Sequence, residues 1–219
     1  MLKIEKTEVC GWEPAIRGMR NPMNSWDKSD TDFSLSGIMS VNGILVPSLG
    51  PNDTDLMRRL CKGGPVHAKF RRMITVYVDI TAPLYWWKEF DTYKVGTVAN
   101  SCSTMHKIHA KEFTMDDFSH EHLNVYNYAF LNMLVDNLNE ARRNFLNDKD
   151  TEYWWQMIQL LPSSYNQKRT VELNYEVLVG MYRDRRHHKL DEWHTVCDWI
   201  ENLPYSWIIT GKENKNGEA

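Results

Sequence analysis

The segment 161–185, LPSSYNQKRTVELNYEVLVGMYRDR, constrains the fold more than any other part of the chain. A Leu-Pro break is followed by a short β-prone run, and Asn174 then precedes a helical pattern. Apolar residues on one stripe at 3.6-residue spacing predict a helix over 174–185. They are Leu173, Val177, Leu178, Met181 and Tyr182. Asn174 is expected at the helix start, where exposed backbone N–H groups attract anions, and Arg185 at its end.

A basic cluster follows this predicted helix. It contains Arg185, Arg186, His187, His188 and Lys189. Cationic side chains at a helix C-terminus complement the helix dipole, which is one interpretation of the cluster. The other interpretation is that some of these side chains bind a phosphate group.

A second informative segment is 70–108. It begins with alternating apolar and polar residues, which predict a β-strand with one buried face. The residues expected on that face are Ile74, Val76, Val78 and Ile80. Thr81 is the expected N-cap of the next helix, LYWWKEFDTY, and Pro83 suits its first turn. A turn of small polar residues is then expected over 97–104.

This turn contains the run Asn100-Ser101-Cys102-Ser103-Thr104. Its hydroxyl and amide groups could cradle the phosphate or the base edge of a ligand. The alternative is an ordinary polar connection, and the composition taken alone favours that alternative.

The remaining elements are predicted from periodicity and from turn residues. They are a strand over 2–9, a loop over 17–36, and helices beginning at Pro51, spanning 119–147, spanning 151–160 and ending before Pro204. The stripe of the long helix is expected to contain Leu123, Tyr126, Phe130, Met133, Leu134, Leu138, Ala141 and Phe145. In the last helix, Leu190, Trp193, Val196, Cys197 and Ile200 are expected to point inward. Strands and helices without regular alternation indicate an α+β domain.

Length and charge exclude several classes of protein. The 219 residues fit one domain, expected over 1–210, followed by a flexible polar tail over 211–219. The net charge of -3 gives no polycation, so no nucleic-acid partner is expected. No apolar run reaches the ~18–20 residues that cross a bilayer, and the N-terminus lacks a signal-peptide pattern. We therefore expect no membrane association and a cytoplasmic location.

Cysteine, histidine and tryptophan offer further candidate sites. The 4 cysteines have no C-x-x-C spacing and are expected to be free thiols, mostly buried. The pairs His106/His109 and His120/His122 invite a metal interpretation, but no carboxylate or cysteine completes a zinc pattern, so we expect surface histidines and no metal. Trp86-Trp87 and Trp154-Trp155 could stack on a flat ligand. Packing is the default, with one tryptophan of each pair facing inward.

The spacing of Leu161-Pro162, Asn174 and Arg185 resembles the C-terminal half of the flavin-dependent thymidylate synthases, the ThyX family. Residues 70–108 resemble the other half of the same active site. The resemblance implies an α+β fold with an antiparallel sheet and a helical bundle. It also implies a homo-oligomer, expected to be a tetramer, in which several subunits build each active site.

Members of that family convert dUMP to dTMP. The resemblance implies methylene-tetrahydrofolate as the one-carbon donor, reduced FAD as the hydride donor, and NADPH as a candidate reductant. The flavin supplies the difficult chemistry, and the protein supplies orientation and charge. Such a scheme needs no protein nucleophile, and we assign no catalytic residue.

The resemblance assigns binding roles to individual residues. The defining Arg-His-Arg triplet at a helix end corresponds here to Thr92-Tyr93-Lys94. The implied cofactor-binding residues are Tyr93, Lys94, Thr97 and Asn174. The implied substrate-binding residues are Asn100, Cys102, Thr104 and Arg185.

The chain departs from the family pattern at several charged positions. Only Lys94 keeps a positive charge in the triplet, Thr104 stands for a phosphate-binding arginine, and Glu176 stands for another arginine. Lysine and threonine cannot reproduce the bidentate geometry of a guanidinium. Each lost charge-assisted bond is worth ~1.5–3 kcal/mol. The sequence therefore resembles a diverged member that lacks the Arg-His-Arg motif.

Three functions follow from this resemblance. The leading hypothesis is a ThyX-like enzyme that methylates dUMP or a related pyrimidine nucleotide. The first alternative is a degenerate oligomer that binds a nucleotide without flavin chemistry. A different reaction on a modified nucleotide is the remaining alternative.

Overall fold

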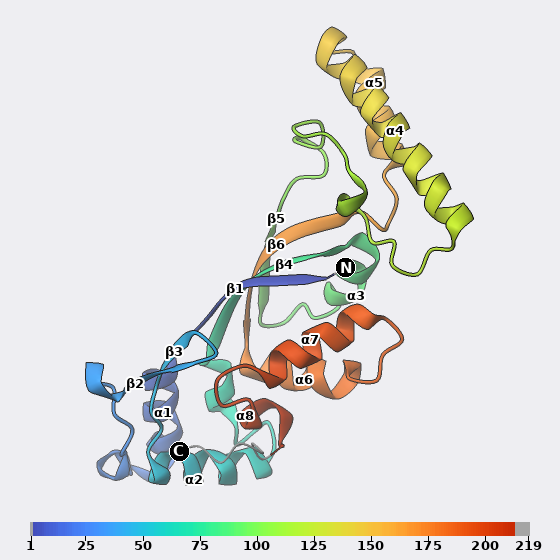
Figure 1. Ribbon diagram of the computed structural model, residues 1–219. Coiled ribbons are helices and arrows are strands. Elements are labelled where there is room, and N and C mark those ends of the chain that lie inside the picture. The colour runs from blue at the N-terminus through green and yellow to red at the C-terminus, as the bar shows by residue number, and fades with distance from the viewer. Residues whose placement is uncertain (1, 213–219) are drawn as a thin grey trace. The chain divides into compact units, whose positions relative to one another are not determined.

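The computed structural model describes residues 2–212, and these form two compact units (Figure 1). Unit 1 is built from described residues of Met1–Lys3, Ile80–Thr92 and Asn100–Thr170. Unit 2 is built from described residues of Ile4–Asp79, Tyr93–Ala99 and Val171–Ala219. The single domain expected over 1–210 stays a prediction. Most of the tail expected over 211–219 lies outside the described residues.

The fold mixes helices with antiparallel sheet, which confirms the α+β class. The main sheet has 4 strands in the order β1-β4-β6-β5. They are β1 (Lys3–Cys10), β4 (Thr75–Pro83), β6 (Asn166–Asn174) and β5 (Thr97–Ser101). The strand predicted over 2–9 is therefore confirmed. So is the alternation around β4, because Ile74, Val76, Val78 and Ile80 are all buried.

A small second sheet pairs β2 (Ile38–Val41) with β3 (Ile44–Pro47) in antiparallel register. The two connecting residues, Asn42 and Gly43, both have positive φ angles, of 51° and 83°. Asn-Gly with this backbone is the favoured two-residue hairpin turn, because its twist matches that of the strands.

Unit 2 contains the helices α1 (Trp12–Arg20), α2 (Pro51–Lys62), α6 (Tyr175–Arg185), α7 (Asp191–Glu201) and α8 (Trp207–Thr210). The helices predicted from Pro51, over 174–185 and before Pro204 are confirmed. Trp193, Val196, Cys197 and Ile200 are buried on α7, as expected. The loop expected over 17–36 begins too early, because α1 continues to Arg20 on a buried stripe that includes Ile16 and Met19. Three short 3-10 helices follow: η1 (Asn21–Met23), η2 (Trp26–Lys28) and η3 (Leu35–Gly37). A further one, η4 (Lys69–Arg72), precedes β4.

A buried ion pair holds α1 to α2. Arg20 Nε lies 2.6 Å from Asp53 Oδ1, and both side chains are buried. The other oxygen of Asp53 accepts hydrogen bonds from Ser29 Oγ, from the backbone N–H of Asp30, and from Thr31. These donors lower the pKa of Asp53 although burial opposes that shift. The pair therefore also fixes the segment between the two helices.

Unit 1 contains α3 (Leu84–Phe90), η5 (Met115–Asp117), α4 (Val125–Asp148) and α5 (Thr151–Leu160). The N-cap predicted at Thr81 is wrong, since Thr81 lies within β4 and Pro83 is the residue before α3. Trp86 and Trp87 are both buried, so the expectation that only one would face inward is also wrong. Trp87 Nε1 donates to the carbonyl of Gln167 at 2.9 Å, which satisfies its polar atom.

The long helix α4 and helix α5 form an antiparallel hairpin, visible in Figure 1. The helix begins at Val125 rather than 119, because Asn124 caps it by accepting a hydrogen bond from the N–H of Asn127. Part of its predicted stripe is wrong as well. The buried residues are Leu131, Val135, Leu138, Asn139 and Ala141, whereas Tyr126, Phe130 and Met133 are exposed. Asn139 satisfies the backbone of Phe113 through both of its amide atoms.

Cysteines and histidines were candidate sites in the sequence. All 4 cysteines are free, but only Cys197 is buried, so the expectation of mostly buried thiols is wrong. Within residues 2–212, no group of three or more histidine, cysteine or carboxylate side chains could hold a metal ion. Among the described helices, none has the length and apolar character to span a membrane.

Candidate functional site

The site is organised by the junction of β6 and α6. Asn174 ends the strand and caps the helix, with its Oδ1 accepting a hydrogen bond from Val177 N–H at 3.1 Å. The next residue, Tyr175, is buried and donates its hydroxyl to the carbonyl of Pro204 at 2.6 Å. Its backbone N–H bonds to the carbonyl of Ile74. The start of α6 is therefore fixed on several sides.

Residues 93–97 run alongside α6, from its C-terminal end to its N-terminal end. Arg185 Nε, at the C-terminal end, donates to the hydroxyl of Tyr93 at 3.0 Å. Gly96, at the other end, has a φ of +77°. A Cβ at Gly96 would come within 3.0 Å of Asn174 Nδ2 and of Val177 Cγ2. This close approach requires glycine, because other residues are strained at positive φ.

A cavity of about 210 Å³ lies at the N-terminal end of α6, and we call it the α6 cleft. Its lining residues are Arg72, Thr75, Gly96, Thr97, Val98, Glu172, Leu173 and Asn174. The structure thus brings together Thr97 and Asn174, which lie in different parts of the chain. Thr97 Oγ1 donates to the carbonyl of Tyr93, which holds the start of β5.

Sequence reasoning missed Arg72, Thr75, Gly96 and Glu172 as lining residues. Part of the signal was present, because side chains two apart share one face of a strand. Thr75 shares the polar face of β4 opposite Val76, and Glu172 shares the face of β6 that carries Asn174. Arg72 had no such signal, since it lies in η4 just before the strand.

The charges in the α6 cleft are one exposed guanidinium, Arg72, and one exposed carboxylate, Glu172. The negative charge of Glu172 raises the pKa of Tyr77, which lies on β4 of the same sheet. Burial raises the pKa of the Cys10 thiol, and Glu172 adds to that shift. A guanidinium can bind a phosphate through two N–H groups, and a carboxylate can accept from a hydroxyl or an amine. The hydroxyl of Thr75 can donate or accept, whereas that of Thr97 already donates to the Tyr93 carbonyl and can accept.

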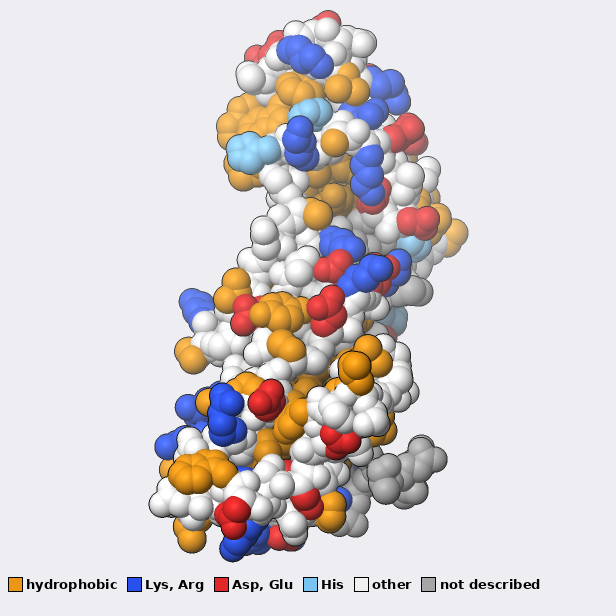
Figure 2. Space-filling view, turned by 90° about the vertical axis from the view of Figure 1, so that its left-hand side faces the viewer, with side chains coloured by type: hydrophobic (Ala, Val, Ile, Leu, Met, Phe, Trp, Pro, Cys, Tyr) orange, Lys and Arg blue, Asp and Glu red, His pale blue; other side chains and the backbone are white. Residues whose placement is uncertain are grey.

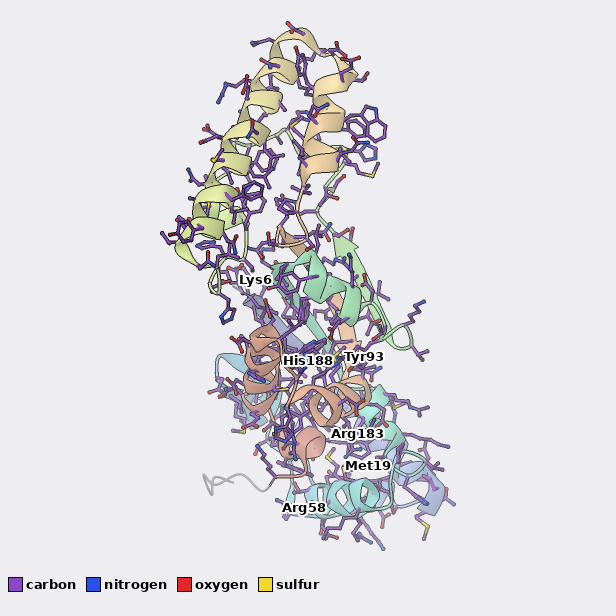
Figure 3. All side chains as sticks on the ribbon, turned by 90° about the vertical axis from the view of Figure 1, so that its right-hand side faces the viewer. Lys6, Met19, Arg58, Tyr93, Arg183 and His188 are labelled. Atoms are coloured by element: carbon purple, nitrogen blue, oxygen red, sulfur yellow. The ribbon has the colours of Figure 1, made fainter. Side chains whose placement is uncertain are left out.

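Arg185 and Lys94 lie outside this set of lining residues. The guanidinium of Arg185 lies over the ring of Trp193, 4.8 Å from its centroid, and over Tyr93 at 5.6 Å. Its Nε–H is already bonded to the Tyr93 hydroxyl. Lys94 is exposed. The rings of Tyr93 and Trp193 are themselves in contact, with centroids 6.1 Å apart. Tyr93 is labelled in Figure 3.

The predicted substrate-binding residues Asn100, Cys102 and Thr104 belong to unit 1. The turn expected over 97–104 is wrong in its first part, because 97–101 form β5. Pairing with the neighbouring strand continues to Cys102, whose N–H donates to the carbonyl of Lys168 at 2.9 Å. Gln167 Nε2 donates to the carbonyl of Cys102 at 2.8 Å. The small polar residues reflect an exposed strand as much as a ligand-binding turn.

Glu176, which stands where the resemblance implies an arginine, has a structural partner. Arg71 Nη1 lies 3.7 Å from Glu176 Oε2, and their side chains are 9% and 19% exposed. The pair links η4 to the first turn of α6. A carboxylate in the first turn also interacts favourably with the helix dipole. The charge reversal at 176 is therefore accommodated by a neighbouring cation.

Comparisons with known proteins locate the fold. No family model and no curated protein matches the sequence. Among solved structures, the flavin-dependent thymidylate synthase ThyX from Helicobacter pylori, complexed with FAD and dUMP, matches with a TM-score of 0.63 at 15% identity. The match covers 95% of this chain and 96% of that chain. A second structure of ThyX from the same organism, also with FAD and dUMP, gives a TM-score of 0.65 at 14% identity, covering 96% and 97%.

A third similar structure is the UMP/dUMP methylase PolB from Streptomyces cacaoi, bound with 5-Br dUMP. Its TM-score is 0.59 at 12% identity, with 94% of this chain and 92% of that chain covered. These likenesses extend over nearly the whole chain and show that it has the fold of the flavin-dependent thymidylate synthases.

Proposed function

We propose that this protein is a ThyX-like enzyme of pyrimidine nucleotide metabolism that methylates dUMP to dTMP with methylene-tetrahydrofolate and FAD. The observation that carries the proposal is the meeting of Thr97 and Asn174 in the α6 cleft. The whole-chain likeness to structures that contain FAD and dUMP supports the same proposal. Cytoplasmic location and NADPH as reductant remain part of it.

The residues of the α6 cleft fit part of FAD rather than the whole cofactor. The cavity of about 210 Å³ is smaller than the ~300–1,000 Å³ of usual cofactor pockets. Within it, Arg72 would hold a phosphate, and Thr97 and Asn174 would bond to polar edges of the cofactor. The flavin, when bound, supplies the redox chemistry. The proposed contacts of Tyr93 and Lys94 with FAD, and of Arg185 with the nucleotide, extend this assignment, and those of Asn100, Cys102 and Thr104 stay predictions.

The proposal includes assembly as a homo-oligomer, most simply a tetramer. Helix α4 exposes apolar side chains on one side: Val125 is 74% exposed, Tyr126 82%, Phe130 70% and Met133 61%. Figure 2 shows hydrophobic side chains on the surface of this end of unit 1. A second copy that covers such a face would remove it from water. Light scattering would then report a mass of several chains.

One observation favours the alternative of a nucleotide-binding protein without flavin chemistry. Glu176 occupies the position of an implied arginine, and its ion pair with Arg71 gives it a structural role. Arg185 is likewise bonded to Tyr93. A chain that has turned binding positions into packing contacts can keep its fold while it loses its cofactor.

Purified protein separates the two functions. Flavin absorbance that copurifies, or FAD binding by calorimetry together with methylation of dUMP, supports the enzyme. Colourless protein that binds dUMP and ignores FAD supports the alternative. Methylation of UMP instead of dUMP would indicate the different nucleotide reaction.

A matched pair of arginine variants locates the ligand. Arg72→Gln should weaken binding of FAD, or of dUMP if no flavin binds, by about tenfold or more, because it removes a charge-assisted bond. Arg59→Gln is the control, since Arg59 is exposed on α2 and pairs with Asp55. Equal affinities in the two variants would remove the α6 cleft from the proposal.

A further inference from the structure

A second and larger cavity lies at the opposite end of α6. Its volume is about 710 Å³, and we call it the α6–α7 cavity. The lining residues are Tyr182, Arg186, His187, His188, His194, Cys197, Asp198, Glu201 and Lys212. None of them lines the α6 cleft. The cavity is therefore unexplained by the proposed function.

The sequence places these side chains by helical periodicity. Tyr182 and Arg186 are four residues apart at the end of α6, so they share one face. His194, Cys197, Asp198 and Glu201 occupy positions i, i+3, i+4 and i+7 of α7, which also form one face. Two histidines, His187 and His188, come from the turn between α6 and α7. His188 is labelled in Figure 3.

One of the two carboxylates that line the α6–α7 cavity, Glu201, is already neutralised. Glu201 Oε1 accepts a hydrogen bond from the Tyr182 hydroxyl at 2.5 Å and lies 2.6 Å from Lys212 Nζ. Lys212 and Tyr182 hold the pKa of Glu201 below its usual value, so it stays ionised and paired. Burial raises the pKa of the Cys197 thiol to about 11, so this side chain remains neutral.

The remaining charges are Arg186, Asp198 and the imidazoles. Arg186 is exposed, and its guanidinium lies over the ring of Tyr182, 5.9 Å from its centroid. Asp191, outside the lining, lies 3.7 Å from His194 Nδ1. The lining is close to neutral while the imidazoles are neutral. Each imidazole that takes up a proton would add one positive charge to it.

We propose that the α6–α7 cavity binds a tetrahedral dianion of the phosphate class between Arg186 and the imidazoles of His187 and His194. Arg186 supplies a planar set of N–H donors, and each protonated imidazole supplies a further charged donor. The Tyr182 ring and the Cys197 thiol form an apolar wall on which the organic part of a phosphate monoester would lie. The volume, far above that of one phosphate, leaves room for it.

Sulfate is the sharpest probe, because its charge does not change between pH ~5 and ~9 and any pH dependence then reports the protein. Calorimetry at constant ionic strength should show sulfate binding about tenfold tighter at pH ~6 than at pH ~8, because added positive charge attracts the anion. In NMR spectra, sulfate should shift the imidazole resonances of His187 and His194. The exposed His67, on another part of unit 2, should not shift.

Two glutamine variants separate a built site from general surface charge. Arg186→Gln should weaken sulfate binding at least tenfold, since it removes the one permanent unpaired guanidinium of the lining. Arg183→Gln is the control, because Arg183 is also exposed near the end of α6 but pairs with Asp184 and does not line the cavity. Binding that is independent of pH, or that falls equally in both variants, overturns the proposal.

Comparing the affinities of two further ligands, phenyl phosphate and inorganic phosphate, identifies the source of the dianion. Phenyl phosphate that binds more tightly than inorganic phosphate at pH ~7 indicates a phosphate monoester with its organic part on the apolar wall. Equal affinities indicate inorganic phosphate itself. Neither result depends on nucleotide methylation, because no residue of the α6 cleft is involved.

Discussion

The two ends of α6 differ in the side chains that carry positive charge around their cavities. At the N-terminal end, Asn174 borders a narrow cleft of about 210 Å³ that holds one guanidinium, Arg72, and one carboxylate, Glu172. At the C-terminal end, side chains line a cavity of about 710 Å³, and several of them are imidazoles. The first end is fixed by the Asn174 cap and by backbone contacts, and the second is lined mainly by charged and imidazole side chains.

This difference also explains the basic cluster after α6. The C-terminal end of a helix carries partial negative charge, so cations there are stabilised before any ligand arrives. Arg185 turns inward onto Tyr93 and Trp193, while Arg186 and His187 face the α6–α7 cavity. Helix stabilisation and anion binding are therefore compatible interpretations of one cluster, because its members point in different directions.

The largest expected effect is at the N-terminal end, in Glu176→Gln. The variant leaves Arg71 nearly buried without its charged partner, and we expect a loss of about 3 kcal/mol in the free energy of unfolding. Urea denaturation measures it. The double variant Arg71→Met/Glu176→Leu should recover most of the loss, because neither charge is then buried. A single variant as stable as the parent would show that this end does not depend on the ion pair.

Gly96→Ala is expected to have the next largest effect. The added Cβ meets Asn174 and Val177 at 3.0 Å, and the backbone has a φ of +77°, so we expect about 2–3 kcal/mol of destabilisation and a distorted cleft. Gly43→Ala is a matched control. Gly43 has a φ of +83° with nothing within 4 Å of the added Cβ, so only the backbone strain of about 1–2 kcal/mol remains. Equal losses in both variants would mean that the close packing at Gly96 contributes nothing.

The sequence predicted the frame around α6 well, since its signals were local. A cap residue, one apolar stripe and a strand of alternating residues define Asn174, α6 and β4 without reference to the rest of the chain. Cleft residues from neighbouring elements were harder to find. Arg72 enters the cleft only because η4 precedes β4, and no local pattern encodes that approach.

The wrong predictions of buried residues arose in helices whose apolar residues occupy more than one face. In α4 the aromatic residues Tyr126 and Phe130 suggested a buried stripe, but Leu131 and Val135 on the adjacent face are the buried ones. Periodicity identifies an apolar face but does not say what covers it. In α3 the reverse holds, because contacts surround the helix and bury both Trp86 and Trp87.

Arg185→Ala tests whether the C-terminal end also serves the nucleotide. If Arg185 contacts its phosphate, as proposed, calorimetry should show binding weakened by about 2 kcal/mol. Arg183→Ala is the control at a neighbouring exposed position. Unchanged affinity in Arg185→Ala would assign this arginine wholly to its contacts with Tyr93 and Trp193.

Asn174→Ala should have a smaller effect on stability. It removes the side chain that accepts from Val177 N–H, and loss of an N-cap typically costs about 1 kcal/mol. Asn174→Asp keeps an acceptor at the same place, so it should retain the stability of the parent while it adds a negative charge to the cleft. If ligand binding falls in Asn174→Asp and stability does not, the cleft binds an anion. If both variants bind ligand as the parent does, Asn174 has only a capping role.

The smallest expected effect is at the C-terminal end, in Tyr182→Phe. The variant removes the hydroxyl that donates to Glu201, and we expect a loss of about 0.5–1 kcal/mol at pH ~7, because the carboxylate is partly exposed and also pairs with Lys212. The pKa of Glu201 is lowered in the folded chain, so this contribution is present above the usual glutamate value and disappears as the pH falls through the lowered one. Unfolding measured from neutral to acid pH should therefore show the two proteins converging. A difference that persists after Glu201 is protonated would mean that the hydroxyl stabilises α6 through packing rather than through the carboxylate.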